Sequence, residues 1–133
     1  MKYERKIPVD LTCGVTVYDL MVGGKWKPYL INCINRGAKR PSEFRRIIPG
    51  ATKRVLQQQL NEMERMGLVS KRVFAEFPAR VEYSLTARGA SLLPIIRSMD
   101  AWGLEHAGLF DEKGRLKTVT GHNGAMDGQP SVD

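Results

Sequence analysis

The sequence contains few of the residues on which most chemical sites depend. Its 133 residues include only two cysteines and two histidines, and the cysteines lack the spacing of zinc ligands or of a disulfide framework. It has no nucleophile motif and no glycine-rich phosphate loop before a helix, so we expect no enzymatic activity, no metal and no cofactor. No apolar run is long enough for a signal peptide or a membrane span, which predicts a cytoplasmic protein with reduced thiols and no membrane partner.

The net positive charge of the chain is concentrated in one stretch. The whole sequence has a formal charge of +7, and residues 36–80 alone hold eleven lysines or arginines against four glutamates. The rest of the chain is therefore neutral overall. A segregated positive region predicts a polyanionic partner, and nucleic acid is favoured over a membrane because no basic amphipathic helix or lipidation motif accompanies it. Simple solubility is the alternative reason for such a charge.

Residues 52–66 have the pattern of an amphipathic helix. At about 100° per residue, one side of this helix is apolar. That side carries Leu56, Leu60 and Met63. The opposite side presents guanidinium and amide groups, which match phosphates and base edges in a DNA major groove. These groups belong to Arg54, Gln57, Gln58, Asn61 and Arg65. A solvated surface helix on any globular domain is the alternative.

The segments around this helix predict a winged helix-turn-helix fold. Residues 42–48 have the pattern of a short helix, which turns at Pro49-Gly50 into the helix of residues 52–66. After that helix the apolar residues alternate, which predicts strands at 69–74 and 80–85 joined as a β-hairpin, the wing. The predicted fold class is therefore α+β and mainly helical.

Further helices are predicted at both ends of this core pattern. Residues 15–22 and 25–34 have helical patterns, and the helical period returns from residue 86, where Pro94 should kink or interrupt it. An apolar stripe on this last helix predicts contact with a second copy of the chain, with packing inside one chain as the alternative. The stripe consists of Leu92, Ile95, Ile96, Met99 and Trp102. We call the predicted helix at residues 52–66 the reading helix. A homodimer would place two reading helices about 34 Å apart on a roughly palindromic DNA site.

The chain is long enough for one domain with an apolar core and too short for two. Residues 1–12 are polar and basic, and Pro8 disfavours a helix there, so we expect an extended N-terminal arm. Residues 13–110 form the predicted DNA-binding and dimerisation domain. Residues 111–133 contain almost no large apolar side chains, which predicts a disordered tail.

Several motifs, in unbroken order from Cys13 to Trp102, resemble the HxlR-type winged helix-turn-helix regulators, bacterial relatives of the MarR-type repressors. The motifs are Gly23-Gly24-Lys25-Trp26, Ile48-Pro49-Gly50, Leu56-Gln57-Gln58-Gln59-Leu60, Glu64-Arg65-Met66-Gly67-Leu68-Val69, Arg80-Val81-Glu82-Tyr83-Ser84-Leu85-Thr86, Gly89 and Trp102. The resemblance implies a homodimer that binds double-stranded operator DNA, with residues 52–66 in the major groove and the hairpin near the flanking backbone. The predicted function is sequence-specific regulation of transcription.

The resemblance also gives Cys13 a role. A cysteine near the start of the first helix often senses oxidants or electrophiles in this family, and Cys13 occupies the matching position, although Gly14 replaces the usual proline after it. The helix N-terminus, together with Lys25 and Lys27 if they lie nearby, would favour the thiolate. Its disulfide partner would be Cys13 of the other subunit. An unreactive structural cysteine is the alternative, and Cys33 has the pattern of a core thiol.

The predicted DNA contacts divide into two groups. Base edges are read by Arg54, Gln57, Gln58 and Asn61. Phosphates are bound by Lys39, Arg45, Arg46, Lys53, Arg65, Lys71, Arg72 and Arg80. The three cations on the strands could instead protect an ordinary solvated strand edge. A winged-helix module that binds proteins without operator specificity is the alternative function, but its reading helix should then expose an apolar face.

Overall fold

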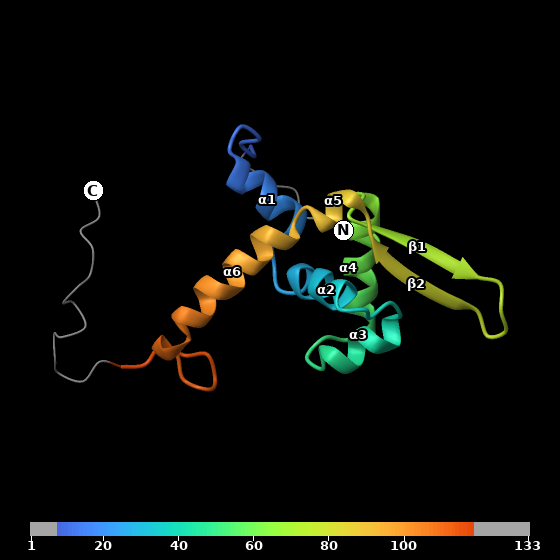
Figure 1. The fold of residues 1–133 in the computed structure, drawn as a ribbon. Helices are drawn as coiled ribbons and strands as arrows, with labels where there is room; N and C mark the ends of the chain where they lie inside the picture. Colours follow the sequence, from blue (N-terminus) through green and yellow to red (C-terminus); the bar gives the residue numbers. More distant parts are fainter. Residues whose placement is uncertain (1–7, 119–133) are drawn as a thin grey trace. The chain divides into compact units, whose positions relative to one another are not determined.

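Residues 8–118 are described in the computed structural model of this chain, and the chain divides into two units after residue 96. Residues 1–7 of the predicted arm and 119–133 of the predicted tail lie outside the described residues. The first unit contains α1 (Gly14–Val22), α2 (Lys27–Asn35), α3 (Pro41–Ile47), α4 (Lys53–Arg65), β1 (Val69–Phe74), β2 (Arg80–Leu85) and α5 (Ala87–Ala90) (Figure 1). Helix α6 (Leu93–Glu105) crosses the division, and the 3-10 helix η1 (Ala107–Leu109) follows it.

The first unit has the predicted winged helix-turn-helix fold. Strands β1 and β2 have the predicted bounds and pair antiparallel, with Val69 opposite Leu85 at one end and Phe74 opposite Arg80 at the other. Helix α4 is one residue shorter at each end than the predicted helix. Helix α3 begins at Pro41, one residue earlier than predicted, because proline suits the first turn of a helix.

Hydrogen bonds define where the two helices of the helix-turn-helix begin. The Thr52 hydroxyl accepts a hydrogen bond from the Val55 backbone N–H at 3.1 Å, which caps α4. The Glu43 carboxylate accepts from the backbone N–H groups of Lys39 and Arg40 at 2.9 and 2.8 Å, and these bonds lower the pKa of Glu43 from its usual value. A charged carboxylate in the first turn also suits the positive end of α3.

An apolar core orients α4. Leu56, Leu60 and Met63 are all buried, as the sequence predicts. They belong to one cluster with residues from α2, α3 and the hairpin, among them Leu30, Ile31, Phe44, Leu68, Val69 and Tyr83. Because fully burying one such side chain contributes about 1.5 to 3 kcal/mol, this packing strongly favours one rotation of α4 about its axis. The polar side of the helix is therefore held outward.

The base of the hairpin is fastened to the end of α4 and to α5. The Thr86 backbone N–H donates to the Leu68 carbonyl at 3.1 Å, and the Thr86 hydroxyl donates to the Gly67 carbonyl at 2.6 Å. Gly89 of α5 lies so close to the backbone of Leu68 that a Cβ atom at this position would overlap the Leu68 carbonyl oxygen. The direction in which the wing leaves α4 is thus set by backbone contacts.

The start of α6 corrects one prediction from the sequence. The predicted interruption near Pro94 is confirmed, because α5 ends at Ala90 and α6 begins at Leu93 with Pro94 in its first turn. Ile96, however, is only 4% exposed and belongs to the core of the first unit, against which Leu92 also packs. Ile96 therefore serves the internal core and is not part of an exposed stripe. Periodicity alone could not show which side of the helix faces that core.

The second unit contains exposed apolar side chains and one ordered turn. Met99 and Trp102 are 51% and 66% exposed, and the Trp102 ring stacks on the His106 ring at 4.1 Å between centroids. The Asp111 carboxylate accepts from the backbone N–H groups of Lys113 and Arg115, both at 2.9 Å, so the described part of the predicted tail includes a hydrogen-bonded turn. Within residues 8–118, no helix combines the length and apolar character needed to cross a membrane.

Candidate nucleic-acid interface

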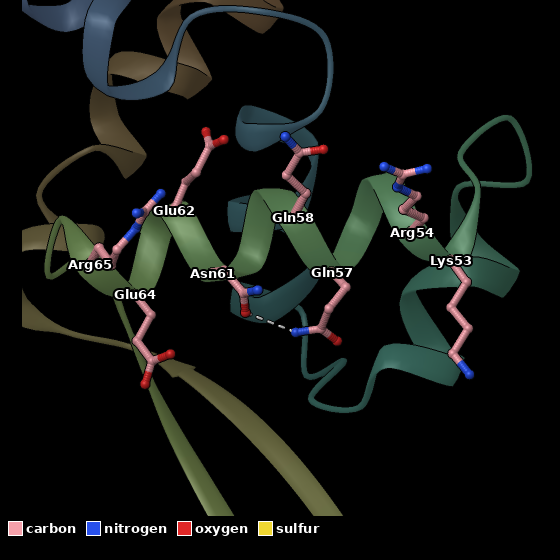
Figure 2. A pocket seen from close by; sticks show the side chains of 8 residues that line it. All are labelled: Lys53, Arg54, Gln57, Gln58, Asn61, Glu62, Glu64 and Arg65. Carbon is pink, nitrogen blue, oxygen red and sulfur yellow. Dashed lines mark hydrogen bonds between the residues drawn. The ribbon is translucent and has the colours of Figure 1, made fainter. Parts of the chain in front are cut away.

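The outward side of α4 forms an open hollow lined by polar side chains. Figure 2 shows eight of them, and they include all four predicted base-reading residues. The lining consists of Lys53, Arg54, Gln57, Gln58, Asn61, Glu62, Glu64 and Arg65. Arg54, Gln57, Gln58 and Asn61 are exposed, so the structure brings the predicted base-reading groups together on one accessible face.

Two of these side chains are joined by hydrogen bonds. The Gln57 Nε2 group lies 3.0 Å from Asn61 Oδ1, the bond drawn in Figure 2, and 3.1 Å from the Tyr83 hydroxyl. Tyr83 comes from the middle of β2 and is only 1% exposed. The sequence predicted a strand over residues 80–85, which includes Tyr83, but did not predict the bond of Tyr83 to the reading helix. That contact joins residues 26 positions apart, and no local pattern reports it.

The predicted phosphate-binding cations outside the wing are accessible. Lys39, Arg45, Arg46, Lys53 and Arg65 are all exposed. In the part of the chain that the structure describes, the ion pairs within 4 Å involve none of these five side chains and do not involve Arg54. Their charge is available to an external anion. Glu64 is the one acid of the hollow that the described ion pairs leave unpaired, since Glu62 is bound to Lys27.

The predicted cations of the wing differ from one another. Lys71 and Arg72 are exposed, and the Arg72 guanidinium lies 4.6 Å from the centroid of the Phe74 ring. Arg80 lies 3.9 Å from the same centroid and pairs with Glu76 at 2.9 Å and with Glu82 at 3.6 Å. Two carboxylates and an aromatic ring therefore surround Arg80, whose side chain is 29% exposed. Glu76 and Glu82 therefore offset part of its charge, and Glu82 also pairs with Arg40 at 3.7 Å.

Lys27 supports the reading helix from α2. Its side chain is buried, and its Nζ donates to Glu62 Oε1 at 2.7 Å and to Gln59 Oε1 at 2.9 Å, both on α4. A buried ammonium needs such partners because an unpaired buried charge is strongly unfavourable. The sequence offered Lys27 only as a possible neighbour of Cys13, and the structure instead directs its ammonium to Glu62 and Gln59. A lysine at the start of a helix gave no sign of partners 32 and 35 residues away.

The two cysteines have different environments. Cys13 is exposed at the N-cap of α1, where the Thr16 hydroxyl and then the backbone N–H groups of Thr16 and Val15 lower the pKa of its thiol. Lys25 contributes nothing to this shift and instead lies over the Trp26 ring at 4.8 Å. Cys33 is buried, which confirms the predicted core thiol, and burial raises its pKa.

Comparisons with known proteins agree with this arrangement. The model of the family described as HxlR-like helix-turn-helix matches residues 21–109. YkvN of Bacillus subtilis (strain 168), named as an uncharacterized HTH-type transcriptional regulator, is 44% identical over 92 residues, which cover 69% of this chain and 78% of that protein. The fold is also similar to two solved regulators. The redox regulator HypR in its oxidized form gives a TM-score of 0.66 at 44% identity over 70% of this chain and 96% of that chain. The reduced form of the transcriptional regulator YodB from B. subtilis gives a TM-score of 0.59 at 29% identity over 68% of this chain and 90% of that chain.

Proposed function

This chain belongs to the HxlR-like helix-turn-helix family of transcriptional regulators, and from that premise we propose that it binds a roughly palindromic operator as a homodimer. The observation that carries the proposal is the outward side of α4. Exposed amide and guanidinium groups gather there on a helix whose rotation is set by the core. Such groups complement both phosphates and base edges, and a helix of this width fits the major groove.

The proposed contacts follow the positions of these side chains. Arg54, Gln57, Gln58 and Asn61 inspect base edges from α4. The phosphate contacts come from the α2–α3 loop, from α3, from both ends of α4 and from β1. They are Lys39, Arg45, Arg46, Lys53, Arg65, Lys71 and Arg72. We assign Arg80 to supporting the wing, because Glu76 and Glu82 already occupy its guanidinium.

Homodimerisation supplies the second reading helix. Three residues of the predicted stripe remain exposed on α6, namely Ile95, Met99 and Trp102. Large apolar side chains at the surface favour contact with a second apolar surface. Two copies related by a twofold axis would contact two half-sites about 34 Å apart, and the operator would share that symmetry.

Control of binding by oxidants is the finer part of the proposal. The similar protein HypR is described as a redox regulator. In this chain Cys13 is exposed, and the lowered pKa of its thiol raises the thiolate fraction at neutral pH, the form that reacts with oxidants. An oxidant would join Cys13 to Cys13 of the other subunit, and the change between the two copies would alter DNA binding.

The test is a salt titration of DNA binding with two duplexes. One duplex carries the sequence immediately upstream of the gene for this protein, and the other carries the same bases in scrambled order. Each titration is run in reductant and after treatment with diamide, and a Cys13→Ser variant serves as the matched control. We expect tighter binding to the upstream duplex, a steep salt dependence on both, and loss of specific binding after oxidation of the wild-type chain only.

Each part of the proposal has its own contradicting result. Specific binding that diamide does not change, or that diamide abolishes equally in the Cys13→Ser variant, would exclude Cys13 as the sensor. The proposed regulation of transcription would still stand. A monomer at the concentrations that saturate the operator would contradict the homodimer. No binding to either duplex at low salt would contradict DNA binding and favour the protein-interaction module.

A further inference from the structure

The amide groups of Gln57 and Asn61 act as one unit in this structure. They lie four residues apart on α4, so both project from the same side of the helix, and they are joined at 3.0 Å. The Tyr83 hydroxyl, on β2, is hydrogen-bonded to the Gln57 amide at 3.1 Å. We propose, as a deepening of the proposed function and resting on it, that Gln57 and Asn61 together read a single adenine and that Tyr83 positions them.

The hydrogen bonds decide what the pair presents to DNA. An amide has two N–H donors on nitrogen and two acceptor sites on oxygen. The Gln57 Nε2 group donates one hydrogen to Asn61, as drawn in Figure 2, and the other to the Tyr83 hydroxyl, which leaves Gln57 Oε1 as an acceptor and Asn61 Nδ2 as a donor.

Rotating both amides by half a turn gives the same outcome. Gln57 Oε1 then accepts from Asn61 Nδ2 and from the Tyr83 hydroxyl, and the free groups are Gln57 Nε2, a donor, and Asn61 Oδ1, an acceptor. Both orientations of the two amides are compatible with these contacts, and both leave the same kinds of group free. In either case one amide of the linked pair presents a nitrogen that is free to donate and the other presents an oxygen that is free to accept.

Only one base presents the matching pair in the major groove. Adenine offers the N7 acceptor beside the N6 donor, whereas guanine offers two acceptors at N7 and O6. Cytosine offers a donor alone, and thymine offers an acceptor beside a methyl group. A pair that presents a free amide nitrogen beside a free amide oxygen therefore satisfies both groups of adenine, whereas guanine leaves the amide oxygen without a donor.

Tyr83 is built to hold this pair in place. Its ring packs against Phe44 at 6.4 Å between centroids, and its backbone N–H donates to the Lys39 carbonyl at 2.8 Å. The ring contact with Phe44 and the backbone bond to Lys39 therefore fix the position of Tyr83 and of its hydroxyl. A glutamine held by such a group loses less freedom on binding than a free one, which favours the correct base.

The experiment selects duplexes from a random pool with four chains. These are the wild type, Gln57→Ala, Asn61→Ala and Gln58→Ala, and every selected base pair is then exchanged in measurements of affinity. We expect an A·T pair in each half-site that the wild type prefers over G·C by about tenfold or more. Gln57→Ala and Asn61→Ala should both abolish the preference at that same pair. Gln58 is the comparison, since this exposed amide on the same helix is proposed to read a different base, and Gln58→Ala should change the preference at another base pair while leaving the preference at that pair unchanged.

Tyr83→Phe tests the positioning role, because it keeps the buried ring and removes only the hydroxyl. We expect it to weaken the preference at the same A·T pair by about threefold, with binding to scrambled DNA unchanged. In a Gln57→Ala background it should have no further effect on that preference. A merely structural hydroxyl would lower affinity for every duplex equally, and it would do so in both backgrounds.

The outcomes separate this inference from the function on which it rests. If the wild type selects no sequence, the proposed function fails and the inference fails with it. If it selects a sequence in which Gln57→Ala and Asn61→Ala alter different base pairs, or the shared pair is G·C, only the inference is overturned. Replacing the adenine by 7-deazaadenine removes the N7 acceptor, and unchanged affinity would overturn it as well. The two alanine variants change exposed side chains, so the result does not depend on the stability of Tyr83→Phe.

Discussion

Helix α4 and the wing both carry basic residues, but the positive side chains of the two regions have different partners in the structure. Arg54, Lys53 and Arg65 on α4 have no carboxylate within 4 Å among the described residues. In the wing, Arg80 has two, Glu76 and Glu82. The difference shows that a count of basic residues gives an upper bound on phosphate contacts. The neighbours of each cation decide how many of them remain available.

The two regions also differ in how a cation supports them. Lys27 is buried behind α4 and binds Glu62 and Gln59, whereas Arg80 lies half-buried on the wing and stacks on Phe74. A buried charge depends entirely on its partners, and a partly exposed one keeps some hydration. Support for the reading helix should therefore be the more sensitive of the two to mutation.

The largest expected effect is on stability at Lys27. Lys27→Met keeps most of the buried volume but leaves Glu62 and Gln59 without their donor, and we expect the free energy of unfolding to fall by about 1 to 3 kcal/mol. The measurement is urea denaturation. Lys25→Met is the matched control, because Lys25 is exposed beside it in sequence, and it should change stability by about 0.5 kcal/mol or less. Equal losses in the two variants would remove the difference claimed for Lys27.

The next effect is on operator recognition by Arg54. Arg54→Ala should lower affinity for the operator by about 1 to 3 kcal/mol and lower affinity for scrambled DNA much less, because a bidentate base contact is lost. Competition titrations measure both affinities. Arg54→Lys keeps the charge without the fork geometry, so it should restore binding to scrambled DNA but not to the operator. Equal losses on both duplexes in Arg54→Ala would exclude base reading at this position.

A smaller, uniform effect is expected at Arg72. Because its guanidinium is exposed and outside the described ion pairs, Arg72→Ala should weaken binding to every duplex similarly. The plot of log affinity against log salt should become shallower by about one unit, which reports the loss of one phosphate contact. An unchanged slope would place Arg72 away from the DNA backbone.

The smallest effect on DNA binding is expected at Arg80. Arg80→Ala removes a charge that Glu76 and Glu82 already offset, so the slope should change by well under one unit. A slope change as large as that of Arg72→Ala would show that DNA draws Arg80 away from its carboxylates. In that case the ion pairs of the free chain would not predict its contacts on DNA.

Local patterns in the sequence predicted the elements that position the site. The period of residues 52–66 gave α4 within one residue at each end, and alternation gave both strands, because these signals depend on neighbours in the chain. The site itself was predicted in part. The four side chains predicted to read bases lie together on α4, but the bonds of Lys27 and Tyr83 to that helix join residues 26 to 35 positions apart. Such contacts, like the inward side of α6 at Ile96, depend on tertiary packing that periodicity does not contain.

Because Cys33 is buried, the reactivity of its thiol reports whether the core of this chain is folded. The sequence has two cysteines, one exposed and one in the core, so a thiol reagent should label one site in seconds and the other only when the core opens. Counting labelled thiols during oxidant treatment therefore distinguishes a signalling event at the surface from general unfolding. One lost thiol with Cys33 still protected marks a switch, whereas labelling of Cys33 marks damage.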